Sequence, residues 1–410
     1  MQETQETQVT EELDVSFVQT PHEVLKRLRE AGPAVKVMLP NGSLVWIVTR
    51  YEEVRQALSE TKLSKDFKGL NELMAKHTKE GHAPKQYDEA LVGHMLASDP
   101  PDHTRMRRLV NKAFTPRRVE SMRPMLQELT TRLLDEMEKH DEIDLLEALA
   151  YPVPMELLCT LLGVPEAERL AFGRYAAVVL SDLAPEGYEE ATRAMREYLV
   201  KLIQVKRDNP GDDLLSALIA ARDEDDKLTE GELLATIYLM FSAGTETAVN
   251  LIGNGVLALL THPGELEKLR TDRSLLPQAV EEFLRFDGPV NLATFRYTID
   301  PVSLGDVTIP VGEVVMVSLM AANRDPDRFD NPELFDITRP IGGQMTFGHG
   351  IHYCMGAPLA RLEAEIALGM LLDRFPDLSL ACDPNELRWR LSTVTHGLEK
   401  LPVRPHGTDG

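Results

Sequence analysis

One long apolar stretch limits the folds that are open to this chain. Between Leu234 and Leu260 the only charged residue is Glu246, and the stretch is long enough to cross a bilayer. Polar residues crowd its middle, however, where a carboxylate would be costly in lipid. Thr229 and Glu232 form the pattern of a helix-capping box just before it, and Pro263 ends it. The stretch therefore predicts a helix of roughly thirty residues, ~45–50 Å long, in the core of a large water-soluble domain.

The composition is that of a globular protein, and its charge argues against one class of binding partner. Of 410 residues, 43% are hydrophobic and 27% are charged, which excludes a disordered or fibrous protein. The formal net charge of −22 argues against nucleic acid as a partner. Three cysteines cannot form a disulfide framework and the acidic start does not resemble a secretory signal, so we expect a cytoplasmic protein. Residues 1–20 are expected to be poorly ordered, and 21–410 to form one domain, since no linker or repeat divides it.

The distribution of patterns predicts a mainly α-helical protein with small β-sheets, of the α+β class. Helical periodicity dominates from about residue 103 to 260 and returns over 355–375. Strand patterns flank the hairpin signal Asn41-Gly42 and recur over 296–320, where the run EVVMVSLMAA is one strand candidate. Residues 63–95 have weak periodicity, which favours a lid, a binding loop or a disordered loop.

The most informative short segment is FGHGIHYCMG, from Phe347 to Gly356, which leads into the last helix. Its glycines permit tight turns around Cys354, and a position at a helix N-terminus stabilises a thiolate. Such a thiolate could be a nucleophile, with His349 or His352 as its base, or a metal ligand. The other two cysteines are distant in sequence, so one axial bond to haem iron fits better than a zinc site. A buried structural cysteine remains the alternative.

A second candidate site lies within the long helix. Ala243, Gly244 and Thr247 share one face, whose small side chains would let a flat cofactor approach closely. The Thr247 hydroxyl can bond back to the carbonyl of Ala243 and open the helix ladder locally. With Glu246 beside it, this face could deliver protons; the alternative is a packing groove next to a solvated acid.

In this order, the motifs resemble those of the cytochrome P450 family. The cysteine run fits the family pattern Phe-x-x-Gly-x-[His/Arg]-x-Cys-x-Gly, and residues 243–247 fit Ala-Gly-x-[Asp/Glu]-Thr. Glu282 and Arg285 fit Glu-x-x-Arg, a pair that alone is weak evidence, with Arg339 as its third partner and Arg328 as a weaker candidate. These would be structural residues that hold the cysteine loop. The resemblance covers essentially the whole chain and implies the cytochrome P450 fold, with the long central helix over the haem.

The resemblance also implies roles for individual residues. Cys354 would be the axial ligand of haem b, an iron protoporphyrin IX, and Glu246 and Thr247 would be the catalytic residues that deliver protons. The residues implied to bind the haem, some of them through its propionates, are His103, Arg107, Ala243, Gly244, Arg296, Phe347, His352, Cys354 and Gly356.

Within the family, the runs PPDHTRMRRLVNKAFTPRRVE and FGHGIHYCMGAPLARLE are similar to bacterial hydroxylases of macrolides and other polyketides, and to a bacterial vitamin D hydroxylase. The implied function is a haem-thiolate monooxygenase that inserts one oxygen atom from O2 into a C–H bond or alkene of a bulky apolar substrate, in macrolide or antibiotic biosynthesis. Thr245 departs from these relatives, which commonly carry His there, so hydrogen bonding in the pocket can differ. The alternatives are a steroid or terpenoid hydroxylase, a peroxide-driven peroxygenase, a non-catalytic haem protein and a cysteine hydrolase.

Substrate contacts are expected in four regions, 63–95, 172–188, 290–294 and 391–395. The apolar residues favoured among them are Val290, Leu292, Ala293 and Val394.

Electrons must come from other proteins, because the sequence has no flavin or iron–sulfur signature. Six basic residues lie between Arg105 and Arg118, an unusual density on so acidic a chain. They predict a docking site for an acidic ferredoxin, itself served by a ferredoxin reductase. The alternative is helix-surface scatter together with propionate ligands.

Overall fold

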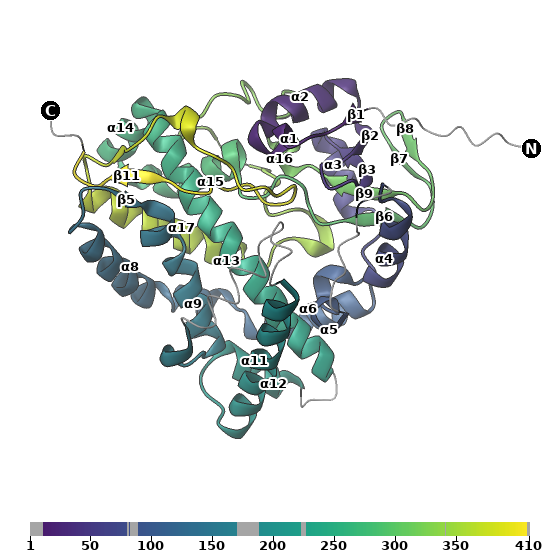
Figure 1. The fold of residues 1–410 in the computed structure, drawn as a ribbon, viewed down its shortest axis with the longest axis horizontal. Helices are drawn as coiled ribbons and strands as arrows, with labels where there is room; N and C mark the ends of the chain where they lie inside the picture. Colours follow the sequence, from purple (N-terminus) through teal and green to yellow (C-terminus); the bar gives the residue numbers. More distant parts are fainter. Residues whose placement is uncertain are drawn as a thin grey trace, which may run out of the picture.

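The fold is mainly helical with small sheets, as predicted, and the strands lie on two sides of the molecule with helices beside each group (Figure 1). Within the described ranges no helix is long and apolar enough to cross a membrane. The computed structural model describes residues 11–79, 82, 89–169, 188–222, 227–340 and 342–407.

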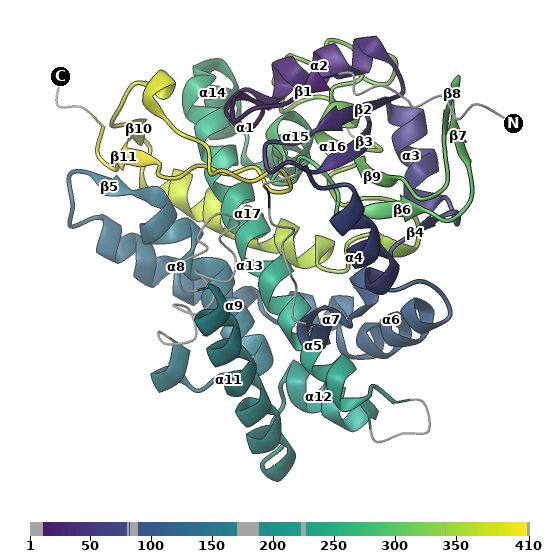
Figure 2. The ribbon, with the colours of Figure 1, turned by 45° about the vertical axis from the view of Figure 1, so that its right-hand side comes forward.

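The long apolar stretch forms helix α13, Glu230–Thr261, which has 32 residues and runs diagonally through the centre of the molecule (Figures 1 and 2). The predicted capping box is present: the Thr229 side chain accepts from the Glu232 amide, and the Glu232 carboxylate accepts from the Thr229 amide. Most of α13 is buried against other helices, among them α9 (Pro152–Leu162) and α17 (Ala357–Arg374). The buried interpretation of the stretch is therefore confirmed.

Further helices surround α13 and cover the sheets. Many begin with proline in the first turn, where its missing N–H costs nothing. They are α1 (Ser16–Gln19), α2 (Pro21–Ala31), α3 (Tyr51–Ser59), α4 (Phe67–Lys76), α5 (Glu89–Val92), α6 (Asp102–Ala113), α7 (Pro116–Glu120), α8 (Arg123–Met137), α11 (Tyr188–Asp208), α12 (Leu214–Arg222), α14 (Pro263–Thr271), α15 (Leu276–Asp287) and α16 (Leu319–Asn323).

Strands from distant parts of the chain form three small sheets. The largest has the order β1-β2-β3-β9-β6-β4, and the others are β10-β11-β5 and the hairpin β7-β8. The predicted hairpin at Asn41-Gly42 joins β2 to β3, with Gly42 in the left-handed region at φ 81°. The strands are β1 (Glu11–Glu12), β2 (Ala34–Met38), β3 (Leu44–Val48), β4 (Leu63–Ser64), β5 (Ile143–Asp144), β6 (Arg296–Thr298), β7 (Val302–Leu304), β8 (Val307–Ile309), β9 (Val314–Val317), β10 (Ser379–Leu380) and β11 (Pro402–Arg404).

Two local predictions were wrong. Residues 11–20 are not poorly ordered: β1 pairs with β2, and Phe17 is fully buried beneath the sheet. The strand candidate over 313–322 ends at Val317, because the Ser318 side chain accepts from the Ala321 amide and caps α16.

The region 63–95 is also more regular than predicted. It contains β4, α4 and α5, and the Asp66 side chain caps α4 by accepting from the Gly69 amide. Residues 80–81 and 83–88 lie outside the described ranges.

Candidate functional site

The predicted haem-binding and catalytic segments meet at a cavity of about 260 Å³. Ala243 and Gly244 on α13 form one wall, and Cys354 on the loop before α17 forms another. His103 and Arg107, from α6, line the same cavity. Segments more than 100 residues apart in the sequence thus converge on one space.

Two positions of the cysteine loop adopt a backbone conformation that glycine takes up more readily than other residues. Gly348 and Gly350 have φ values of 73° and 71°, and a Cβ at Gly350 would lie 3.0 Å from the Leu58 carbonyl oxygen. The Cys354 amide donates to the Phe347 carbonyl at 2.9 Å, which closes the loop before α17. The loop therefore holds Cys354 in a defined position.

The Cys354 thiol is open to the cavity and enclosed by protein on its other sides. The backbone amides of Gly356 and Ala357 and the guanidinium of Arg107 favour its thiolate, as the helix N-terminus predicts. Burial outweighs them, however, and raises the pKa of Cys354 above its ordinary value. The predicted stabilisation of a thiolate by the helix N-terminus is therefore present, but burial of the sulfur opposes it.

The segment 243–247 of α13 has the predicted local geometry, although Glu246 and Thr247 are not among the residues that line the cavity. The Thr247 hydroxyl donates to the Ala243 carbonyl at 2.7 Å, and a Cβ at Gly244 would meet nothing within 4 Å. The Glu246 carboxylate accepts from the Thr395 hydroxyl at 2.9 Å, a partner that the sequence did not reveal. Thr245 is fully buried, and its hydroxyl donates to the Phe241 carbonyl at 3.1 Å. Thr245 therefore directs its hydroxyl into its own helix rather than to the cavity.

The basic residues proposed for the propionates gather on one side of the cavity. The rings of His103 and His352 lie 4.4 Å apart between centroids, and Arg107 donates to the Tyr353 carbonyl at 2.6 Å. Neither ring nitrogen of the buried His103 has a hydrogen-bond partner among the described residues. Burial, with nearby cations, lowers the pKa of His352 to about 2, and burial lowers that of Arg296 to about 10. Within this cluster the two arginines donate to backbone carbonyls, Arg107 to Tyr353 and Arg296 to Thr294, whereas the His103 ring has no such partner in the described part of the chain.

The Glu-x-x-Arg residues lie behind the cysteine loop. Glu282 and Arg285 are almost completely buried and form a two-pronged ion pair with both N–O distances at 2.7 Å. Arg339 approaches the same carboxylate at 3.5 Å. Arg328, the weaker candidate, instead donates to the Gly342 carbonyl. The structure thus places Arg339, and not Arg328, beside the pair.

The residues expected to contact substrate are not among those that line this cavity. Leu292 is fully buried against the sheet, and Val290, Ala293 and Val394 pack against the neighbouring cores. Residues 172–187 of the second candidate region lie outside the described residues. Met95, at the end of the candidate region 63–95, lines the cavity, and the apolar wall residues that sequence reasoning missed are Leu96, Leu239 and Met240. Leu239 and Met240 precede Ala243 by one helical turn, so their spacing could have identified them.

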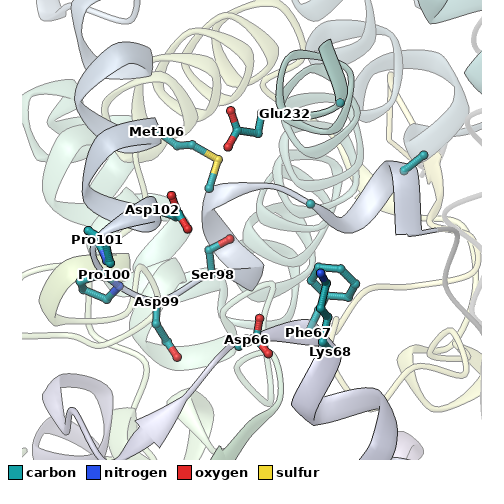
Figure 3. A pocket seen from close by; sticks show the side chains of 13 residues that line it. Asp66, Phe67, Lys68, Ser98, Asp99, Pro100, Pro101, Asp102, Met106 and Glu232 are labelled. Carbon is teal, nitrogen blue, oxygen red and sulfur yellow. The ribbon is translucent and has the colours of Figure 1, made fainter. Parts of the chain in front are cut away.

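A second cavity, of about 530 Å³, lies beside α4 and the first turn of α13 (Figure 3). Asp66, Asp99 and Glu232 make its wall polar, and no histidine or cysteine lines it. The chemistry-bearing side chains therefore gather at the smaller cavity.

The basic residues of α6 and α7 differ in their surroundings: some have partners within the chain and others are exposed. Arg105 pairs with Glu232, Arg118 pairs with Asp212, and Arg107 turns toward the cysteine loop. The exposed basic residues of the segment are Arg108, Lys112 and Arg117.

Comparisons with known proteins identify related chains. Residues 177–385 match the family model described as Cytochrome P450. Cytochrome P450 107B1 of Saccharopolyspora erythraea is 49% identical over 392 residues, with 96% of each chain covered. The cytochrome P450 monooxygenase PikC of Streptomyces venezuelae is 45% identical, covering 96% of this chain and 92% of PikC. The structure of the tirandamycin C-bound P450 monooxygenase TamI has a TM-score of 0.89 and 48% identity, covering 96% of this chain and 99% of TamI.

Proposed function

The chain belongs to the cytochrome P450 family, and we propose that it is a haem-thiolate monooxygenase that oxidises a macrolide or related polyketide in secondary metabolism. The observation that carries the proposal is the largely apolar cavity between the small-residue face of α13 and Cys354. The similarity to PikC and to TamI, whose structure was solved with tirandamycin C, supports the substrate class. Three free cysteines support a cytoplasmic location. We also propose that the single haem domain includes residues 11–20, since they pack on its sheet.

The residues at the cavity fit haem b. Cys354 would hold the iron, and His103, whose ring nitrogens lack partners, would donate to a propionate together with Arg107, Arg296 and His352. Ala243, Gly244 and Gly356 would give the ring its flat surroundings, and Phe347 would support it through its backbone bond to Cys354. When bound, haem supplies the activation of O2 and the transfer of one oxygen atom to the substrate.

The residues of the chain itself would deliver protons and orient the substrate. The Thr247 hydroxyl, held at the Ala243 carbonyl, can pass a proton into the cavity, and Glu246 can replenish it. Thr395 holds the Glu246 carboxylate in place for this relay. The acid and the alcohol favour O2 and a redox partner over peroxide as oxidant, and a non-catalytic haem protein would have no need of them.

An optical titration tests the substrate class. We expect macrolactones to displace water from the ferric iron and to shift the Soret band toward the high-spin form in a saturable way. A shift with steroids or terpenoids alone would retain the monooxygenase and replace the polyketide by one of those classes. A purified protein without haem would overturn the proposal altogether.

Thr247→Ala should separate oxygen consumption from product formation. Without the hydroxyl, proton delivery is lost, and we expect the product formed per NADPH to fall by at least about tenfold, with peroxide released instead. Haem content should not change. The matched control is Thr245→Ala, because that hydroxyl is buried in its own helix. Unchanged product per NADPH in the Thr247 variant would show that the proposed relay is wrong.

The exposed cations of α6 and α7 are proposed to dock a ferredoxin. Arg108 and Lys112 are on α6, the helix that also carries Arg107. Arg107 in turn contacts the cysteine loop through the Tyr353 carbonyl. Reversing the charge of Lys112 and Arg117 to Glu should slow reduction by ferredoxin about tenfold at low salt and flatten its salt dependence. The control is Lys400→Glu, an exposed site near the C-terminus. A salt dependence equal to that of the native protein would contradict this docking site.

A further inference from the structure

Lys65 is a buried lysine whose position is unusual for its charge. Its side chain is 3% exposed, and its ammonium nitrogen donates to the Thr294 hydroxyl at 2.5 Å. Within the described part of the chain it forms no ion pair. Burying an unpaired ammonium costs several kcal/mol, so such a residue persists where a partner arrives or where it gives up its proton.

The sheet places Lys65 opposite another cation. β4 and β6 pair antiparallel, with Leu63 opposite Thr298 and Ser64 opposite Tyr297, so the next position of this register sets Lys65 opposite Arg296. Like charges that face each other across two strands are destabilising, and Arg296 is also buried. A buried pair of this kind favours an anion between or beside the two side chains.

The other groups that face Lys65 do not supply that anion. His94, His103 and His352 come from three different segments, and the charge of Lys65 helps to lower the pKa of each of them. The one acid coupled to it is Asp99, whose carboxylate already accepts from the Ser64 hydroxyl and from the Lys65 amide. When Lys65 is protonated, the buried groups therefore carry an excess of positive charge, with Lys65 and Arg296 against Asp99.

Asp99 does not line the haem cavity. Figure 3 shows it on the wall of the polar second cavity, together with Asp66, which follows Lys65 in the chain. The His103 amide donates to the Asp99 carbonyl at 3.0 Å, and the His103 side chain lines the haem cavity, as does that of His352. The one acid coupled to Lys65 is thus outside the cavity lining, whereas two of the histidines coupled to Lys65 are part of it.

We propose that Lys65 is a carboxylate-binding residue of the haem site and that it takes up one proton from solvent when haem binds. The inference rests on the proposed haem site. Burial and the field of Arg296 hold the pKa of Lys65 well below its ordinary value, so Lys65 loses its proton more readily than an exposed lysine. A bound propionate opposes this effect, because the ammonium then gains an ionic partner.

The sign of the pH dependence follows from this linkage. The pKa of Lys65 is lower without haem than with it. At a pH between these two pKa values, haem binding takes up a proton, so haem is retained less strongly as the pH rises through this range. The histidines do not contribute there, since burial lowers the pKa of His94 to about 4, that of His352 to about 2, and that of His103 below its ordinary value. Arg296, with its pKa lowered to about 10, stays charged below about pH 9.

The test is the transfer of haem from the holoenzyme to excess apomyoglobin, between about pH 7 and 9. Lys65→Met should lose haem about 10- to 100-fold faster, because a charge-assisted hydrogen bond is removed, and its rate should not depend on pH. Lys65→Arg keeps the charge and should retain haem nearly as well as the native chain, also without the pH dependence. The matched control is Lys62→Met, three residues earlier, which is exposed and paired with Asp300.

Three results would overturn the proposal. They are native rates of haem loss in Lys65→Met, native pH dependence in either Lys65 variant, and equally fast loss in Lys65→Met and Lys65→Arg, since the last would indicate a role in packing alone. If Lys65→Met does not fold, Lys65→Arg still tests the pH dependence. A native chain that carries no haem would instead overturn the haem site and the proposed function.

Discussion

Replacing Cys354 with serine is expected to abolish oxygenation while leaving the chain folded. Serine has almost the same size, and the turn around it is set by Gly348 and Gly350 and by the backbone bond to Phe347 rather than by the sulfur. An alcohol does not provide the electron donation of a thiolate ligand, which favours cleavage of the O–O bond. We therefore expect product formation to fall by at least about 100-fold, on the scale of a catalytic group that is removed outright.

Spectra and turnover measure this effect separately. The ferrous carbon monoxide complex of the native protein should have the red-shifted Soret band of a thiolate-ligated haem, and the Cys354→Ser variant should lack it. The matched control is Cys382→Ser, because Cys382 is a free, partly exposed cysteine away from the cavity. A native carbon monoxide spectrum in the Cys354 variant would show that another residue holds the iron.

The central helix and the cysteine loop could be predicted because their signals are local. A capping box, an apolar run and a terminating proline define α13, and all lie within a continuous stretch of sequence. Glycines at 348 and 350 mark a backbone with positive φ in the same way. In such segments, short-range stereochemistry and long-range packing favour the same structure.

Residues that act through non-local pairing could not be predicted. Lys65 is in a stretch without clear periodicity, and it becomes notable only when β4 pairs with β6, more than 200 residues later. Thr395 reaches Glu246 in the same way, from the far end of the chain. The apolar residues Val290 and Leu292 had the composition of a substrate pocket, but the same composition serves a core, and the sheet buries Leu292 completely.

Arg285→Leu is expected to have the largest effect on stability. Arg285 is 1% exposed, and besides its two bonds to Glu282 it donates to the carbonyls of Asn323, Pro332 and Leu334. It therefore joins α15 to the segment that leads toward the cysteine loop. Its loss would leave the fully buried carboxylate of Glu282 with Arg339 as a more distant cation, at 3.5 Å.

Breaking a buried pair from one side costs about 3–5 kcal/mol, which is a large part of the ~5–15 kcal/mol that stabilises a typical folded protein. We expect little haem-loaded Arg285→Leu protein, and a correspondingly lower urea midpoint for what can be purified. Arg285→Lys should recover only part of the loss, because an ammonium cannot reproduce the planar fork that reaches Glu282 and three carbonyls.

The matched control is Lys139→Leu, which breaks the pair of the same spacing with Glu136, where both side chains are more than 60% exposed. Solvent screens that exposed pair, so its loss should change the urea midpoint little. An equal shift of the urea midpoint in the two variants would show that burial of the Glu282–Arg285 pair does not determine its contribution to stability.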